Sequence, residues 1–264
     1  MSTPAPVPTF WLGTHRPNWL AKTDVPLMVS RRTLATRKTL PQAQGPWVLD
    51  SGGFTELNLY GRWETDVATY VSEVSRIRDE VGHLEWCAPM DWMCEPSVRE
   101  KTGLTVAEHQ SRTTTNFLEL RQQLGETVIP VVQGWERDDY LRHIDGYEAA
   151  GVDLTAERVV GAGSVCRRNS DGQIGAVLRT LYRSGLSVHA FGVKGTAFVA
   201  CADVVTSADS LAWSATARLA PGPMLHGCTH KRCANCFPWA MTWRERTVRR
   251  VEAQLSQSTL EIPA

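Results

Sequence analysis

Residues 46–54 are Pro46-Trp47-Val48-Leu49-Asp50-Ser51-Gly52-Gly53-Phe54. The apolar part of this stretch predicts a short buried strand, and Asp50 stands where that strand ends. Two glycines follow, and glycine lets a ligand come close to the backbone. An α/β protein presents an acid to a ligand in this way, at the C-terminal end of a strand. The same residues also form good turns, so their function depends on what the rest of the chain places beside them.

Short apolar runs of this kind recur and alternate with amphipathic segments of helical length. They predict eight strands, at 9–13, 25–30, 47–50, 84–91, 128–134, 158–163, 188–193 and 204–209. Apolar residues at helical spacing predict helices at 65–81, 105–124, 138–150, 174–184, 196–202 and 239–255. Alternating strands and helices imply a parallel sheet, because parallel neighbours need crossover connections. Eight such strands can close into a (β/α)8 TIM barrel, which fits 264 residues, and a doubly wound open sheet is the alternative.

The overall composition limits the classes of protein. The chain has 28 basic and 28 acidic side chains, so a nucleic-acid partner would need a local basic patch. No apolar run is long enough to span a membrane, and the N-terminus has no signal-peptide pattern. Seven cysteines, three of them within 228–236, favour a metal site in a reducing cytoplasm over disulfides. No Gly-x-Gly-x-x-Gly follows an early strand, which counts against a dinucleotide-binding fold.

Polar residues stand at the ends of several predicted strands. They are Asp50, Asp91, Gln133 with Gly134, the run Gly161-Ala162-Gly163, and Asp209. In a parallel barrel all these ends lie on one face, where active sites of this fold are built. Each acid alone could be a helix N-cap, but their convergence predicts a binding site.

These groups suit the exchange of a base on a sugar. No histidine stands at these strand ends, so a serine-type triad is not supported. Two carboxylates can act as nucleophile and general acid/base at a glycosidic carbon. A third acid beside a carboxamide suits the polar edge of a heterocycle with N–H donors and a carbonyl. A sugar-active barrel enzyme is another interpretation, but it leaves the cysteine cluster and the basic clusters unexplained.

A second constellation lies near the C-terminus. Cys228, His230, Cys233 and Cys236 match a closed tetrahedral Cys3His zinc site. His226 could replace His230 as the nitrogen ligand, and free cysteines in a loop are the alternative to a metal site. Because protein atoms would fill all four positions, we expect a structural metal with no water to activate.

These features predict the organisation of the chain. We expect a flexible lead at 1–8 and a single barrel domain at 9–264. That domain would include the zinc knuckle at 226–236 and a basic C-terminal helix at 239–255.

Basic and aromatic residues near the predicted strand ends have two interpretations. Basic clusters at 31–38 and at Arg167-Arg168 are either local phosphate-binding surfaces or solvated faces. Tryptophans in or near the strand-to-helix loops could stack on a base or pack the loops, and they are Trp63, Trp92, Trp135 and Trp213.

Over roughly residues 47–236, the chain resembles the tRNA-guanine transglycosylase (queuine/preQ1 tRNA-ribosyltransferase) superfamily. The matching strings are, in order, Asp50-Ser51-Gly52-Gly53-Phe54; Asp91 with Cys94-Glu95-Pro96; Val131-Val132-Gln133-Gly134; Gly161-Ala162-Gly163; Phe191-Gly192-Val193; Asp209 before Ser214-Ala215-Thr216-Ala217-Arg218; and the cysteine cluster. Enzymes of this family are (β/α)8 barrels with a structural zinc, and they exchange a guanine in nucleic acid for a 7-deazaguanine base. The short chain and compressed zinc region look more like the DpdA-type branch, which modifies DNA in bacterial islands and phages.

The resemblance implies a role for each matching position. Asp209 looks like the nucleophile that holds the sugar covalently, and Asp50 looks like the general acid/base. The substrate-binding residues that it implies are Asp91, Gln133, Gly134, Gly161, Ala162, Phe54, Ser51 and Gly52. In the metal cluster, His230 replaces a cysteine of the family pattern and Cys236 replaces a more distant histidine.

The resemblance also implies a reaction and partners. We expect a pentosyltransferase that replaces guanine in DNA by a preQ0-like base through a covalent Asp-glycosyl intermediate. Its partners would be DNA, with tRNA as the alternative, a free 7-deazaguanine base, and possible helper proteins or a second copy of the chain. A non-catalytic zinc-bearing subunit that binds nucleic acid is a further alternative, against which the retained acids argue. We expect a cytoplasmic protein without a membrane partner.

Overall fold

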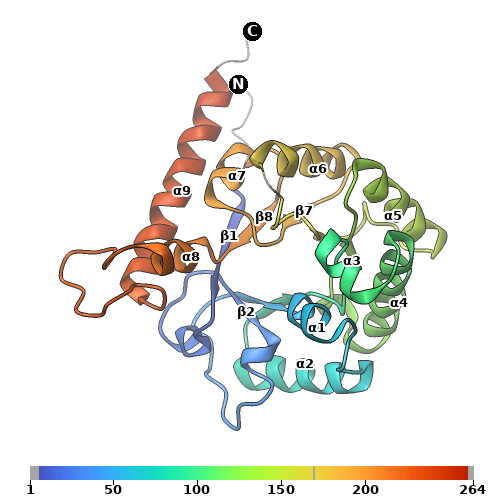
Figure 1. Cartoon of the computed structure of the whole chain (residues 1–264), viewed down its shortest axis with the longest axis horizontal. Helices are drawn as coiled ribbons and strands as arrows, with labels where there is room; N and C mark the ends of the chain where they lie inside the picture. The colour runs from blue at the N-terminus through green and yellow to red at the C-terminus, as the bar shows by residue number, and fades with distance from the viewer. Residues whose placement is uncertain (1–5, 169, 261–264) are drawn as a thin grey trace.

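The structure is a computed structural model that describes residues 6–168 and 170–260 (Figure 1). Residues 1–5 of the predicted flexible lead lie outside the described residues. The strands are β1 (Thr9–Thr14), β2 (Leu27–Ser30), β3 (Trp47–Asp50), β4 (Leu84–Cys87), β5 (Val131–Val132), β6 (Val160–Ala162), β7 (Val188–Ala190) and β8 (Ser207–Ser210). The α-helices are α1 (Gly53–Tyr60), α2 (Val67–Val81), α3 (Pro96–Thr102), α4 (Val106–Leu124), α5 (Arg137–Ala149), α6 (Asp171–Arg183), α7 (Gly195–Ala200), α8 (Ala212–Leu219) and α9 (Phe237–Leu260).

The eight strands form one parallel sheet that curls on itself. Their order is β4-β3-β2-β1-β8-β7-β6-β5, and each neighbouring pair is parallel. At the two ends of this order, a single parallel bridge joins Cys87 to Val128, and the amide of Ile129 donates to the Cys87 carbonyl at 3.1 Å. Figure 1 shows the helices arranged around the strands. The predicted (β/α)8 TIM-like fold is confirmed.

The first two strand-to-strand connections of the barrel, both within the described residues, contain no α-helix. Only the short 3-10 helices η1 (Pro17–Ala21) and η2 (Arg31–Thr33) follow β1 and β2. The outer side of β1 is instead covered by α9, which packs against β1, α7 and α8. In this contact the ring of Trp243 lies 5.9 Å from that of Phe10.

Two strands are shorter than the apolar runs predicted. The run at 84–91 forms a strand only to Cys87, and the run at 128–134 forms one only at Val131–Val132. Proline lies beside both boundaries, at Pro89 and Pro130, and it has no N–H to donate to a ladder. The helices α1, α3 and α8 were not predicted, because each is too short to show a clear helical period.

Large side chains fill the inside of the barrel. Trp11, Met28, Val48, Trp86 and Ile129 form a buried cluster separate from the core that the strands share with the helices. Their sequence neighbours on β1 to β4 belong to that outer core, as expected from the alternation of side chains along a strand. Among the helices of the described ranges, none is both long and apolar enough to cross a membrane.

Candidate active site

A cavity of about 440 Å³ lies at the C-terminal ends of the strands. The segments that follow all eight strands contribute to its wall. The acids among the described residues that line it are Asp50, Asp91, Glu95 and Asp209, and Gln133 supplies a carboxamide. The strand-end acids that the sequence pattern singled out therefore lie around one cavity.

Asp50 is the last residue of β3, and the turn after it holds its carboxylate. The amide of Gly52 donates to Oδ2 of Asp50 at 3.1 Å, and Gly52 has a left-handed backbone with φ of 79°. This conformation favours glycine, which explains the residue after Ser51. Burial raises the pKa of Asp50 to about 6, the negative charge of Asp209 adds to this shift, and a hydrogen bond with Ser30 opposes it. Asp50 can therefore gain or lose a proton near neutral pH.

Asp91 lies beyond β4 and lines the same cavity as Asp50. A turn in which the Asp91 amide donates to the Pro89 carbonyl at 2.9 Å carries it there, so it does not end the strand as predicted. The Ser51 hydroxyl donates to Oδ1 of Asp91 at 3.1 Å, and Gln133 Nε2 donates to Oδ2 at 2.6 Å. Burial and the charge of Asp50 raise the pKa of Asp91 to about 7, although both hydrogen bonds favour the ionised form.

A buried chain of hydrogen bonds extends from Gln133 to Glu95 through Ser164. The Ser164 Oγ lies 2.7 Å from Oε1 of Gln133 and 3.0 Å from Oε2 of Glu95, and it accepts from the Cys94 amide at 2.7 Å. One hydroxyl hydrogen cannot serve both acceptors. If Glu95 carries a proton, it donates to Ser164, which then donates to Gln133, and every group is satisfied. Burial raises the pKa of Glu95, in agreement with this arrangement.

Neither Ser164 nor the partner role of Glu95 was predicted from the sequence. Ser164 has a left-handed backbone with φ of 54°, which is uncommon for a residue with a side chain. This conformation places its hydroxyl between two segments that lie far apart in the sequence. A rare backbone angle cannot be identified from residue type alone, so the sequence carried no signal for Ser164.

Asp209 lies within β8, beside a histidine on β7 whose Nε2 is buried and makes no hydrogen bond within the described part of the chain. Its Oδ1 accepts from the Gly192 amide at 2.7 Å and lies 3.4 Å from Nε2 of His189. His189 is fully buried, and its Nδ1 lies 2.9 Å from the Ser207 hydroxyl. The sequence pattern considered only the strand ends that carry the acids, and His189 lies within β7 instead. The alternation of side chains along β7, which turns every second residue inwards, is the signal that could have found it.

The other predicted base-pocket residues fall into two groups. Phe54 lines the cavity. Ser51 is not among the described lining residues, but its hydroxyl donates a hydrogen bond to Asp91, which is. The rest are absent from the described lining, and they are Gly52, Gly134, Gly161 and Ala162. The wall at this place is formed by residues 163–166, which directly follow β6.

A larger residue than glycine would not fit at Gly161 on β6 or at Gly163 just after it. A Cβ at Gly161 would come within 2.4 Å of the Phe191 ring. One at Gly163 would come within 2.3 Å of the Gln133 amide nitrogen. These glycines thus leave room for side chains that shape the cavity.

Several basic and aromatic residues that could have bound nucleic acid have structural partners. Arg31 is buried, forms ion pairs with Glu56 and Glu73, and donates from Nε to the Ser51 carbonyl at 3.1 Å. Arg168 donates to the Trp135 carbonyl at 2.6 Å. Of the tryptophans considered as stacking platforms, Trp92 and Trp213 are buried, and none of the four lines the cavity. The aromatic residues that line it are Phe54 and Phe191.

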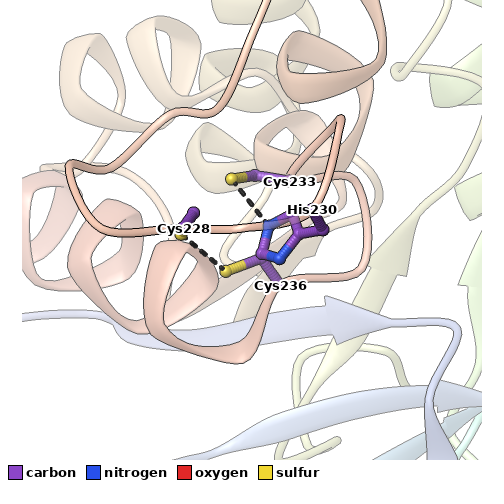
Figure 2. A group of neighbouring side chains, drawn as sticks. All are labelled: Cys228, His230, Cys233 and Cys236. Atoms are coloured by element: carbon purple, nitrogen blue, oxygen red, sulfur yellow. Dashed lines mark hydrogen bonds between the residues drawn. The ribbon is translucent and has the colours of Figure 1, made fainter.

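The cysteine cluster lies in the loop between α8 and α9 (Figure 2). One ligand atom from each of Cys228, His230, Cys233 and Cys236 lies within 4.8 Å of the others. The sulfurs of Cys228 and Cys236 are 3.8 Å apart. A tetrahedral zinc with Zn–S bonds of about 2.3 Å places its sulfurs about 3.8 Å apart, so these residues could hold such an ion. The histidine in the cluster is His230, not His226.

The cavity and fold define a (β/α)8 barrel protein with an acid-rich site at the position where enzymes of this fold bind substrates. The chain belongs to the DpdA family, DeoxyPurine in DNA protein A, whose model matches residues 8–262. The predicted DpdA-type membership is confirmed, and it implies a transglycosylase-type enzyme with a role in deoxypurine modification of DNA.

Two further comparisons give no functional information. None of the curated proteins matches the chain. Among solved structures, the chain is similar to the crystal structure of xylanase B from Clostridium stercorarium F9, with 10% sequence identity and a TM-score of 0.42. That similarity covers 77% of this chain and 85% of the xylanase chain.

Proposed function

We propose that the protein is a base-exchange transglycosylase that replaces guanine in DNA by a 7-deazaguanine base of the preQ0 type. One observation carries the proposal beyond family membership. Asp50 and Asp209 line the same cavity as Asp91 and Gln133, whose side chains are joined by a hydrogen bond of 2.6 Å. A sugar carbon and a base edge could thus be held by different groups at once.

In the first half of the proposed reaction, Asp209 attacks C1′ of the target nucleoside. A C1′–O bond to Asp209 forms as the C1′–N9 bond breaks, and the electron pair leaves with guanine. Asp50 in its acid form, or water, gives a proton to the departing base. The Gly192 amide and His189 lie beside Oδ1 of Asp209, so Oδ2 is the atom that we assign to the attack.

In the second half, a 7-deazaguanine binds where guanine was. Asp50, now ionised, takes the N9 proton of the incoming base. N9 attacks C1′, the C1′–O bond breaks, and the Asp209 carboxylate is restored. One N-glycosidic bond replaces another, so the exchange needs no redox partner.

The base edge is the part of the substrate that we assign to Asp91 and Gln133. An ionised carboxylate has about four lone-pair positions, and the Ser51 and Gln133 donors occupy one on each oxygen. The remaining positions can accept N–H groups of the base. Since the target base is stacked in duplex DNA, it must leave the stack to reach this cavity.

The metal cluster has a structural role in this proposal. Cys228, His230, Cys233 and Cys236 would hold zinc through four protein atoms. A bound zinc would fix the loop between α8 and α9, and we route no chemical step through it.

The proposal is tested by exchange of labelled guanine or preQ0 into DNA. We expect Asp209→Asn to lose exchange by several orders of magnitude and to form no covalent protein–DNA adduct, because a carboxamide is a poor nucleophile. Asp145→Asn is the matched control, since Asp145 is an exposed acid on α5. Full exchange by Asp209→Asn would remove this residue from the mechanism. Exchange into tRNA but not into DNA would refute the assigned substrate.

A further inference from the structure

A second cleft, of about 400 Å³, lies beside the active-site cavity. Its wall is formed by segments after β1 and β2 and by Asn235, which directly precedes Cys236 of the metal cluster. His15 and Thr33 line both this cleft and the active-site cavity. The two hollows are therefore adjacent, and a single extended ligand could occupy both.

The cleft is rich in hydrogen-bond donors and cationic groups. Arg16, Lys22 and Arg37 line it, and none of its described lining residues carries a carboxylate. Asn18 also lines it, and its side-chain oxygen accepts from Nη2 of Arg37 at 2.7 Å. The amide nitrogen of Asn18 thus remains as a donor for a ligand.

The charges in this cleft are not neutralised within the described part of the chain. No ion pair involves Arg16, Lys22 or Arg37 there, whereas Arg31 and Arg32 nearby both pair with Glu56. The Nε of Arg37 is buried and has no hydrogen-bond partner. Because this atom has no exposed surface, an anion in the cleft would pair with the charge of the Arg37 guanidinium and not with Nε itself.

The environment of His15 supports a positive potential at the point where the two hollows meet. Burial, and then the charges of Arg218 and Arg16, lower the pKa of His15. Partial burial is the larger cause of this shift, and the positive charges of the two arginines add to it. The same field would attract a phosphate.

We propose that this cleft binds phosphodiester groups of the DNA strand next to the nucleotide whose base enters the active-site cavity. A nucleotide that leaves the stack stays attached to its flanking phosphates, which must then lie beside the cavity mouth. We call the set His15, Arg16, Asn18, Lys22, Arg37 and Asn235 the phosphate cleft. The choice of DNA rests on the proposed function, whereas the recognition of phosphate rests on the cleft alone.

The test is DNA binding measured by fluorescence anisotropy over a range of salt concentrations. The probe is a labelled single-stranded DNA oligonucleotide that contains guanine. We expect the double variant Arg16→Glu/Lys22→Glu to bind on the order of tenfold more weakly, because it replaces two cations by two anions. Arg37→Gln should lower the slope of log K against log salt by about 0.7, the value for one lost contact to a single strand.

Arg183→Glu is the matched control for surface charge. Arg183 is exposed and lies in the last turn of α6, next to the start of β7 and so at the opposite end of the barrel. We expect its DNA affinity to be unchanged. Thermal unfolding and metal content of the double variant should match the wild type, since Arg16 and Lys22 are exposed.

Several results would overturn the assignment. Equal losses in Arg183→Glu and the cleft variants would indicate bulk electrostatics, and unchanged affinity in the cleft variants would exclude the cleft. Competition by inorganic phosphate or deoxyguanosine monophosphate as strong as that by the oligonucleotide would indicate a site for a free anion. Loss of tRNA binding with DNA binding intact would replace DNA by RNA as the partner.

The assay also separates this inference from the proposed chemistry. Asp209→Asn should bind DNA as the wild type does, because Asp209 is not part of the phosphate cleft. If the wild type exchanges no base but the cleft variants still lose DNA binding, the proposed function fails and the phosphate cleft stands.

Discussion

The side chain of Gln133 donates from Nε2 to Oδ2 of Asp91, and the two atoms lie 2.6 Å apart. These residues follow β5 and β4, the two strands at the ends of the sheet order, between which a single parallel bridge remains. The hydrogen bond therefore ties together the part of the barrel where backbone pairing is weakest. It also holds both groups towards the cavity that we assign to the base.

Binding of the free base should depend on pH through Asp91. The pKa of this acid is raised to about 7, and only its ionised form can accept several N–H groups. We expect the affinity for preQ0 to rise about tenfold per pH unit below 7 and to level off above it. Isothermal titration of Asp91→Asn should show weak binding without this dependence. The range from pH 5 to 8 spans about two units below and one above that pKa. Wild-type binding that stays constant over this range would contradict the role of Asp91 in binding the base.

The stability of the folded protein should fall as pH rises, whereas the affinity for the base should increase. The pKa of Asp91 rises from 3.8 to about 7 on folding, so the folded protein binds this proton more tightly than the unfolded chain does. The stabilisation from the acid form is present below 3.8 and is lost as pH rises towards 7. We expect Asp91→Asn to raise the melting temperature at pH 8 and to match the wild type near pH 4, by differential scanning fluorimetry. If Asp91→Asn is less stable than the wild type at pH 8, the ionised Asp91 carboxylate does not destabilise the fold.

The hydrogen bonds from Glu95 to Ser164 and from Ser164 to Gln133 should hold the Gln133 side chain in position, with Glu95 in its neutral form. Glu95→Gln can still donate to Ser164, so we expect its Michaelis constant for the base to stay within about threefold of the wild type. Ser164→Ala leaves Oε1 of Gln133 without a donor, which should cost about 1–3 kcal/mol and raise that constant by about 5- to 150-fold. Ser164→Gly separates the lost hydroxyl from backbone strain, because glycine accepts the φ of 54° more readily. If Glu95→Gln is as impaired as Ser164→Ala, Glu95 acts as a carboxylate instead.

Removal of the metal should disorder the segment that joins α8 to α9. The Ser214 hydroxyl donates to the Ala234 carbonyl at 2.7 Å, and Trp239 Nε1 donates to the Trp213 carbonyl at 3.0 Å, so this segment is held against α8. We expect one zinc per chain by elemental analysis, and cleavage within 220–236 by limited proteolysis after chelation. Cys233→Ser should behave like the chelated protein. Cys201→Ser is the control, because this buried cysteine lies outside the cluster and its loss should leave the metal content unchanged.

Arg31 should be important for stability, although both interpretations of its basic cluster, a phosphate-binding surface or a solvated face, placed it at the surface. Arg31→Met leaves the buried Glu56 with one cation fewer and removes the donor to the Ser51 carbonyl. We expect a loss of about 3 kcal/mol in urea unfolding, as when one partner of a buried pair is removed. Arg62→Met, which breaks an exposed pair with Glu64, should cost about 1 kcal/mol or less. Equal effects would mean that Arg31 is no more important than a surface charge.

Features encoded within a short stretch could be predicted from the sequence. The acid and glycines after β3 were identified because the strand, the acid and the turn are consecutive residues. The metal cluster was identified because its four ligands lie within nine residues, and only the choice between His226 and His230 needed the fold. The extents of β4 and β5 were overestimated, since the apolar run of β4 continues past Pro89 after pairing has ended, and β5 begins only after Pro130.

The sequence alone predicted eight parallel strands with acids at their C-terminal ends, and the fold decided that the sheet curls into a barrel and is not open. The tertiary structure decided which groups touch. Glu95 and Ser164 are 69 residues apart, and their contact requires a left-handed residue after β6. His189 meets Asp209 because parallel pairing of β7 with β8 places their side chains on one face of the sheet. The fold also divides the basic cluster at 31–38, since Arg31 pairs with Glu56 and Glu73 whereas Arg37 lines the second cleft. Such pairings depend on distances through space, which periodicity and local spacing along a chain do not specify.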